Sequence, residues 1–207
     1  MRSLKLIPFT FLLYLLFFSS CVSKRSEQNN QESNVLQASY REIKLDTATF
    51  AAGCFWCIET IFNQVKGVEE VIPGYMGGKK EEANYKDVCS GYTEHAEVVK
   101  VVFDSNIISF SKILDFFFSV HDPTSLNRQG NDIGPQYRSV IFYSSQNQLK
   151  MIEKLINKIN NKFKNNIVTE INSLMEFYQA EDYHIDYYNI NKNQPYCSLV
   201  ISPKILS

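Results

Sequence analysis

The chain has 207 residues, of which 44% are hydrophobic and 21% charged, and its formal net charge is −1. This length allows one domain with a proper hydrophobic core. A net charge near zero, without a long basic run, argues against a nucleic-acid-binding surface and against an electrostatic membrane patch. We therefore expect a single folded domain that makes no nucleic-acid contacts.

The first 20 residues have the pattern of a secretory signal peptide. Basic residues precede the apolar run 6–18, which is short for a transmembrane span, and two serines then lead to Cys21. A cysteine directly after small residues resembles a bacterial lipoprotein signal, in which Cys21 is acylated and becomes the new N-terminus. The alternative is ordinary signal cleavage, with Cys21 discarded or left as a free thiol.

The segment 21–40 is expected to combine the anchor cysteine with a flexible tether. Residues 22–34 are rich in Ser, Asn, Gln and mixed charge and have no apolar period. The remaining residues, 41–207, form the expected catalytic domain. Together these segments predict an exported protein that is lipid-anchored to a bacterial membrane, on its periplasmic or cell-surface side.

Strands and helices alternate along 41–207, which favours an α/β or α+β domain. In chain order we expect a strand at 47–52, a helix at 54–65, a strand at 68–75, a polar loop at 77–91, a strand at 95–104, a helix at 109–120, a long loop at 121–135, a strand at 138–143, a helix at 145–163, a short strand at 167–171 and a short helix at 180–188. Long loops inside a compact domain are often functional, which directs attention to 121–135.

The most informative residues, Gly53-Cys54-Phe55-Trp56-Cys57, join the first strand to the first helix. A helix N-terminus favours an anion by up to ~2 kcal/mol, which predicts a lowered pKa for the Cys54 thiol. The thiolate is the nucleophilic form, so Cys54 is a candidate reactive cysteine. Cys57 lies one helical turn later on the same face. Spacing alone leaves two other interpretations open, an inert buried thiol and half of a zinc site, although no second Cys-x-x-Cys pair follows.

The residues around this pair resemble the A-type peptide methionine sulfoxide reductases. The match runs in order from about Thr47 to Lys204. Besides Gly53-Cys54-Phe55-Trp56 and Glu59 it includes Gly74-Tyr75, Gly77-Gly78, Tyr85, Val88-Cys89-Ser90-Gly91, His95-Ala96-Glu97, His121-Asp122-Pro123, Arg128-Gln129-Gly130-Asn131-Asp132, Gln136-Tyr137-Arg138-Ser139, Ala180-Glu181-Asp182-Tyr183-His184 and Asn193-Gln194-Pro195-Tyr196-Cys197. One departure, Glu94 in place of the usual glycine, adds a charge near the expected site.

The resemblance implies a fold and a reaction. The fold is a two-layer sandwich of mixed sheet and helices with a long C-terminal coil. The reaction is the thiol-dependent reduction of methionine S-sulfoxide, free or in proteins, to methionine, which repairs oxidised proteins. It proceeds through a sulfenic acid on Cys54 and an intramolecular disulfide. Neither a metal nor an organic cofactor is implied.

The resemblance also assigns roles within the site. Cys54 is the nucleophile, Glu97 the acid, Tyr85 and Tyr137 the hydroxyl donors, and Asp132 a loop carboxylate, while Phe55 and Trp56 form the wall that receives the S-methyl group of the substrate. The sequence supports Glu97 separately, because a carboxyl buried in a valine-rich strand resists ionisation. The competing interpretation of Glu97 is an outward charge on a half-exposed strand. The competing interpretation of Tyr85 and Tyr137 is ordinary packing of tyrosines in a tyrosine-rich chain.

Two cysteines are candidates to resolve the sulfenic acid. Cys57 is favoured because it is local, and Cys197 is a possible second resolving cysteine that requires the tail to fold over the site. Cys89 is expected to be structural. The disulfide then needs an external dithiol, which the resemblance implies is a thioredoxin-like protein, and we expect a monomer.

Two other functions compete with the reductase. The first is an exported thioredoxin-type thiol–disulfide oxidoreductase, which needs only Cys54 and Cys57. The second is a non-enzymatic surface lipoprotein that binds methionine-containing partners. The first leaves Glu97, Tyr85 and Tyr137 unexplained, and the second would tolerate loss of Cys54.

Overall fold

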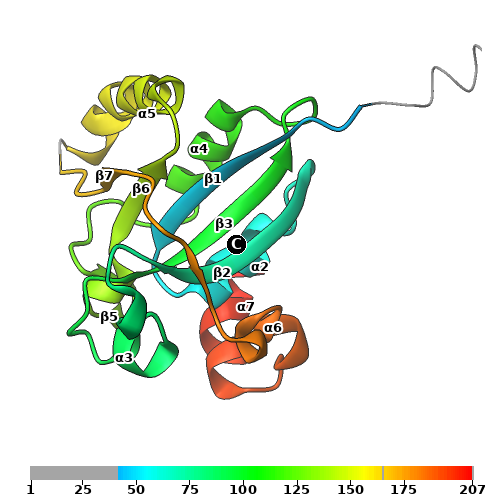
Figure 1. Cartoon of the computed structure of the whole chain (residues 1–207), viewed down its shortest axis with the longest axis vertical. Helices are drawn as coiled ribbons and strands as arrows, with labels where there is room; N and C mark the ends of the chain where they lie inside the picture. Colours follow the sequence, from blue (N-terminus) through cyan, green and yellow to red (C-terminus); the bar gives the residue numbers. More distant parts are fainter. Residues whose placement is uncertain (1–41, 165, 207) are drawn as a thin grey trace, which may run out of the picture. The chain divides into compact units, whose positions relative to one another are not determined.

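A six-stranded mixed sheet forms the centre of the domain in a computed structural model, which describes residues 42–164 and 166–206 (Figure 1). The strand order is β7-β6-β1-β3-β2-β8, and every neighbouring pair is antiparallel except β6 with β7. The strands are β1 (Leu45–Ala52), β2 (Val68–Met76), β3 (Ala96–Asp104), β6 (Ser139–Tyr143), β7 (Glu170–Ser173) and β8 (Tyr178–Gln179). The predicted signal peptide at 1–20 and the anchor and tether at 21–40, with Cys21, lie outside the described residues.

Three helices cover one face of this sheet. They are α2 (Phe55–Phe62), α4 (Phe110–Ser119) and α5 (Gln146–Ile159). Their apolar side chains pack with those of β1, β3 and β6 in one buried core, which includes stacked Phe50 and Phe117. Ser109 caps the N-terminus of α4, because its side chain accepts a hydrogen bond from the Lys112 backbone N–H.

Extended chain covers the opposite face. The segment between β7 and α6 (Tyr187–Ile190) runs across the sheet, and Phe177 packs there against a second buried cluster that contains Met76, Val98 and Phe142 (Figure 1). This is the wrapping coil expected for the C-terminal part. The last residues differ from that expectation, since Cys197–Ile201 forms a π-helical turn and α7 (Ser202–Leu206) continues it.

Several predicted elements are changed in detail. The segment 77–91 is not all loop: it contains a 3-10 turn at Lys80–Glu82 and α3 (Tyr85–Cys89). The side chain of Asn84 caps α3 by accepting from the Asp87 N–H, a local signal that outweighs the polar composition.

The long loop at 121–135 folds back on itself. It contains a small hairpin of β4 (Arg128–Gln129) and β5 (Asp132–Ile133), followed by a 3-10 turn at Pro135–Tyr137. Further on, β7 starts at Glu170 rather than at 167. The helix expected at 180–188 is split because Asp186 has a φ of 53°, a left-handed conformation that a continuous helix does not allow.

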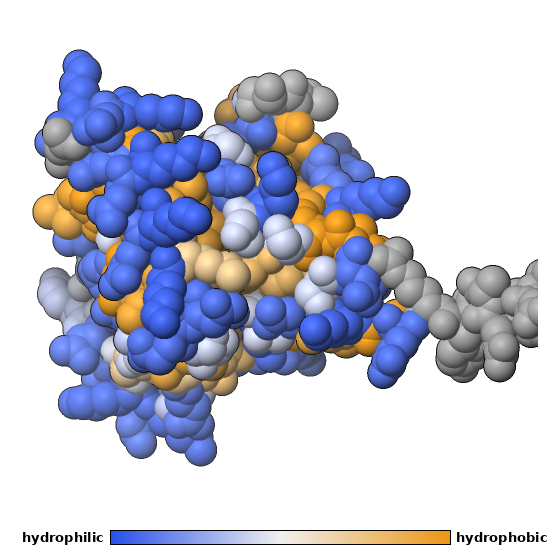
Figure 2. Space-filling view, turned by 90° about the horizontal axis from the view of Figure 1, so that it is seen from above, coloured by the Kyte–Doolittle hydropathy of each residue, from blue (hydrophilic) through white to orange (hydrophobic). Residues whose placement is uncertain are grey.

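The surface at the end where α4 and α5 lie is mostly hydrophilic, with apolar areas between the charged side chains (Figure 2). Within the described part of the chain, no helix has the length and apolar character needed to cross a bilayer.

Candidate active site

The turn from β1 into α2 places Cys54 at the first position before the helix. Gly53 has a φ of +90°, and a Cβ there would lie 2.7 Å from Cβ of Gln129, so this turn requires glycine. Cys54 occupies the N-cap position, and its carbonyl accepts hydrogen bonds from the backbone N–H groups of Cys57 and Ile58.

A pocket of about 300 Å³ opens beside Cys54. Its walls come from the β1–α2 turn, α3, β3, the 121–137 segment and the C-terminal segment. It is lined by Cys54, Phe55, Trp56, Tyr85, Glu97, Asp132, Tyr137, Tyr187 and Tyr196. Seven of these nine residues were predicted from the sequence as catalytic or substrate-binding. The two predicted resolving residues, Cys57 and Cys197, lie in a neighbouring buried cluster that also contains Cys54 and Ile201.

Glu97 is the buried acid of this pocket, with only 2% of its surface exposed. One carboxylate oxygen accepts the backbone N–H of Phe55 at 2.9 Å, and the other lies 3.9 Å from the thiol sulfur of Cys89. Burial raises the pKa of Glu97 to about 8 despite these donors, and the nearby Asp132 carboxylate adds to the effect. Of the two interpretations of Glu97, the buried one is therefore confirmed, and the carboxyl carries its proton at neutral pH.

The predicted lowering of the Cys54 pKa is wrong. Burial, the hydrogen bond to Cys57 and the nearby Glu97 raise the pKa of the Cys54 thiol well above its ordinary value. The first free N–H of the helix, that of Phe55, points to Glu97 instead of the thiol. The first backbone N–H of the helix therefore binds the Glu97 carboxyl. Desolvation raises the pKa of Cys54 more than the remaining helix dipole lowers it.

Cys57 behaves in the opposite way. The Cys54 thiol donates a hydrogen bond to it, which lowers the pKa of Cys57 more than burial raises it. The ammonium of Lys204 lies 3.8 Å from the Cys57 sulfur and acts in the same direction. Of the two thiols, Cys57 is therefore the one that loses its proton more readily.

Tyr85 and Tyr137 present protonated hydroxyls on the side of Glu97. Burial raises the pKa of both phenols far above their ordinary value. Both hydrogen-bond to Cys89, whose own pKa burial raises to about 11. Cys89, expected to be only structural, thus contacts the acid and both phenols.

Sequence reasoning missed two aromatic walls of the pocket. Tyr187 stacks on Trp56 with ring centroids 3.8 Å apart. Tyr196 donates its hydroxyl to both carboxylate oxygens of Asp132, at 2.9 and 3.0 Å. Tyr196 precedes Cys197 in a motif that the resemblance includes, so the sequence did carry a signal for it. Tyr187 lies in no such motif, and nothing distinguishes it from the other tyrosines of this tyrosine-rich chain.

Other buried polar groups support the wall residues. The indole N–H of Trp56 donates to Nδ1 of His184 at 3.0 Å. The carboxylate of Glu59 accepts the backbone N–H of Asp186 at 2.8 Å, and burial raises its pKa to about 7. These bonds attach the C-terminal segment to α2 and so hold Tyr187 in place.

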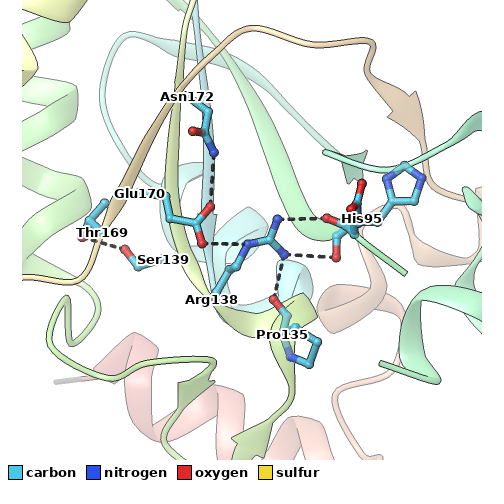
Figure 3. Close-up of polar contacts among 8 residues, drawn as sticks. His95, Pro135, Arg138, Ser139, Thr169, Glu170 and Asn172 are labelled. Carbon is cyan, nitrogen blue, oxygen red and sulfur yellow. Dashed lines mark hydrogen bonds and ion pairs between the residues drawn. The ribbon is translucent and has the colours of Figure 1, made fainter. Parts of the chain in front are cut away.

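Arg138, which follows Tyr137 in the chain, links several segments near the pocket (Figure 3). Its guanidinium donates to the backbone carbonyls of Glu94, His95 and Pro135. It also pairs with Glu170 on β7 at 3.3 Å. The side chain of Glu94, which sequence analysis flagged as an added charge, is exposed, and its backbone contributes to this support.

No group of three or more His, Cys, Asp or Glu side chains in the described part of the chain is arranged to hold a metal ion. The thiols, the acid and the phenols instead form a site for sulfur chemistry.

Comparison with known proteins agrees with this chemistry. The family model for peptide methionine sulfoxide reductase matches residues 46–207. The chain belongs to this family. The reductase is 51% identical to peptide methionine sulfoxide reductase MsrA of Saccharolobus solfataricus over 161 residues, which are 78% of this chain and 91% of that relative.

Solved structures show the same fold. Reduced Mxr1 from Saccharomyces cerevisiae matches with a TM-score of 0.71 and 35% identity, covering 77% of this chain and 92% of Mxr1. Mxr1 solved in complex with Trx2 matches with a TM-score of 0.51 and 27% identity, over 71% and 88% of the two chains. The predicted α/β fold and the activity of an A-type peptide-methionine (S)-S-oxide reductase are thereby confirmed, and the thioredoxin-type alternative is not favoured.

Proposed function

We propose that Cys54 is the nucleophile and Glu97 the acid in the thiol-dependent reduction of methionine S-sulfoxide. The observation that carries this assignment is the buried Glu97 carboxyl, protonated at neutral pH in the same pocket as Cys54. Tyr85 and Tyr137 line the same pocket and supply hydroxyl donors for the charge that develops on the sulfoxide oxygen. Asp132 orients Tyr196 by accepting its hydroxyl.

The first step transfers one oxygen atom. The Cys54 sulfur attacks the sulfoxide sulfur while Glu97 donates its proton to the sulfoxide oxygen. The attack forms a transient bond between the two sulfur atoms. This bond and the bond between the oxygen and the methionine sulfur then break, the oxygen becomes bonded to the Cys54 sulfur, and methionine leaves. In net, a thiol and a sulfoxide give a sulfenic acid and a thioether, so the thiol proton replaces the one that Glu97 gave up.

Phe55, Trp56 and Tyr187 supply the apolar side of the pocket for the S-methyl group. Trp56 is held between the Tyr187 ring and the hydrogen bond to His184. A methyl site on one side and oxygen donors on the other distinguish the two sulfoxide epimers, which accounts for S selectivity. The site is complete within one chain, which supports a monomeric enzyme.

Cys57 resolves the sulfenic acid in this proposal, with Cys197 as a possible second thiol. Cys57 already hydrogen-bonds to Cys54, and Cys197 is buried in the same cluster. The resulting disulfide is reduced by an external dithiol. The match to Mxr1 bound to Trx2 supports a thioredoxin-like reductant.

A test begins with Cys54→Ser, which should abolish the reduction of methionine sulfoxide while the fold, followed by circular dichroism, stays intact. Residual turnover within tenfold of the wild-type value would rule out the nucleophile assignment. Cys57→Ser should still convert one equivalent of substrate but fail to turn over with a thioredoxin-type reductant. Peptide mapping after one turnover should show a Cys54–Cys57 disulfide, and a Cys54–Cys197 disulfide would reverse the roles of the two resolving candidates.

The location of the enzyme is part of the proposal. We propose that the chain is exported, acylated at Cys21 and tethered by 21–40, so that the catalytic domain 41–207 repairs proteins on the periplasmic or cell-surface side. The support is the sequence pattern of the first 21 residues. Replacing Cys21 by Ala in the native host should block processing or release the protein from the membrane. A wild-type chain that is soluble, unacylated and cleaved elsewhere would contradict the anchor.

A further inference from the structure

A lysine from the last helix reaches the thiol pair. Lys204 lies on α7, and its ammonium nitrogen is 3.8 Å from the Cys57 sulfur, within hydrogen-bonding distance for a sulfur acceptor. The helix that carries it packs directly against α2, the helix that carries Cys57. A charged side chain from 147 residues further along the sequence therefore points at the residue proposed to resolve the sulfenic acid.

Among the residues that the structure describes, the other titratable groups shown to act on Cys57 carry no positive charge. Cys54 donates a hydrogen bond to it, and Cys197 and Tyr196 lie in the same cluster. The carboxyls of Asp132 and Glu97 also act on it, and a negative charge on either one disfavours a Cys57 thiolate. Of the named groups that face Cys57, Lys204 alone is cationic.

The position of Lys204 limits the desolvation of its ammonium group beside a largely apolar cluster. The lysine also lines an open hollow of about 570 Å³ together with Ile61 and Phe116. A lysine that borders such a hollow retains contact with water while its ammonium approaches the buried thiol.

We propose that Lys204 is the residue that prepares Cys57 to resolve the Cys54 sulfenic acid, by stabilising the Cys57 thiolate through direct contact. This inference rests on the proposed function, because it assumes that Cys57 is the resolving cysteine. Lys204 touches a reacting sulfur, and its role lies in the recycling half of the reaction.

The step is balanced in atoms and charge. The Cys57 thiolate attacks the Cys54 sulfur, an S–S bond forms, and the S–OH bond breaks. The hydroxide leaves as water after it takes up the proton that the Cys57 thiol lost to solvent. In net, one thiol and one sulfenic acid give one disulfide and one water.

The expected effect is moderate and has a characteristic pH dependence. Loss of the ammonium raises the pKa of Cys57, and a rise of about one unit leaves roughly tenfold less thiolate at neutral pH. A more basic thiolate is also a better nucleophile. With a Brønsted coefficient of about 0.5, each thiolate reacts about threefold faster, which offsets part of the tenfold loss. The net expectation is a resolution step about threefold slower near pH 7. The deficit should shrink as the pH rises, because the thiolate population recovers.

The experiment uses Lys204→Met, which keeps the length and removes the charge, and Lys204→Arg, which keeps the charge. After rapid mixing with methionine sulfoxide, methionine release reports the first step. Dimedone added at successive times traps the sulfenic acid that remains, and the decrease in the trapped amount reports the second step. The expected result for Lys204→Met is one equivalent of methionine, slower sulfenic acid loss at about pH 7 and a smaller deficit at about pH 9. Lys204→Arg should restore the rate at least in part.

Two controls separate this role from a structural one. Lys192→Met removes the same charge from the same C-terminal segment, where the lysine lies over the Tyr188 ring, and should leave sulfenic acid loss unchanged. In a Cys57→Ser background Lys204→Met should alter neither the rate of methionine release nor the residual rate of sulfenic acid loss, because the thiolate it stabilises is absent. An effect that persists in that background would show a structural role and overturn the inference.

The remaining outcomes distinguish the inference from the proposal on which it rests. If Cys57→Ser turns over normally and a Cys54–Cys197 disulfide forms, the assignment of Cys57 as resolving cysteine fails. If Cys57→Ser fails to turn over but Lys204→Met loses its sulfenic acid at the wild-type rate at every pH, only the role of Lys204 is overturned.

Discussion

Glu97→Gln should make the protein more stable at alkaline pH and much less active. Glu97 is buried, and one of its oxygens accepts the Phe55 backbone N–H. A glutamine keeps the shape of the side chain and an oxygen for that N–H, but it has no proton to donate and never ionises. The substitution therefore separates the electrostatic cost of this carboxyl from its place in the fold.

The size of the stability effect follows from linkage. The folded-state pKa of Glu97 is about 8, whereas an unfolded glutamate titrates near ~4.3. Between these values the folded state holds a proton that the unfolded state has lost, so wild-type stability falls as the pH rises from ~4.3 through about 8. A gap of nearly four pKa units corresponds to at most about 5 kcal/mol at pH 8 or above. The advantage of the glutamine variant over wild type should thus grow with pH across this window.

Activity should change in the opposite direction. Loss of a general acid typically costs ~10²-fold or more in the chemical step, so single-turnover methionine release should slow by at least that factor. In the wild type the same rate should fall as the pH rises through about 8, because Glu97 then loses its proton. The variant should lack this alkaline limb.

The assay pairs urea unfolding at about pH 5 and pH 8 with single-turnover measurements over the same range. Matched measurements on Glu176→Gln, an exposed glutamate whose carboxylate bonds only locally to Tyr178, serve as the control for removing one negative charge. A stability difference from wild type that does not change with pH would refute the raised pKa. A wild-type rate of methionine release in Glu97→Gln would refute the acid role.

Two further predictions concern the walls of the site. Gly53→Ala should lower the free energy of unfolding by ~1 kcal/mol or more and slow the reaction, because a φ of +90° is strained for alanine and the new Cβ meets Gln129. A urea midpoint and a rate close to those of the wild type would contradict the need for glycine in this turn. Trp56→Phe should leave buried Nδ1 of His184 without its donor, at a cost of about 1–3 kcal/mol, and should raise KM for methionine sulfoxide; steady-state kinetics with both parameters unchanged would show that the indole does not shape the pocket.

The sequence was sufficient for the part of the fold that periodicity and local signals determine. The valine-rich strand that carries Glu97, the N-cap at Ser109 and the turn at Gly53 are each encoded by a few neighbouring residues. Ordered motifs were sufficient to name seven of the nine residues that line the pocket. The alternation of strands and helices gave the correct fold class.

The pKa of Cys54 could not be predicted from local sequence. Its environment depends on Glu97, 43 residues further along, taking the helix N–H, and on a buried cluster that Cys197 completes. A helix N-terminus is a local signal, whereas desolvation is set by the tertiary structure. Tyr187 and Lys204 were missed for the same reason, because only the folded C-terminal segment brings them to α2.

The same C-terminal segment serves both halves of the reaction. Tyr187 and Tyr196 complete the substrate pocket, while Cys197 and Lys204 surround the thiol proposed to resolve the intermediate. Because Cys57 is 1% exposed and Cys197 is fully buried, an external dithiol has no direct path to a disulfide on either residue. We therefore expect reduction of a disulfide on either residue to need a movement of the segment from Tyr196 onward, which slower hydrogen exchange in this segment of the reduced protein than in that of the oxidised protein would support.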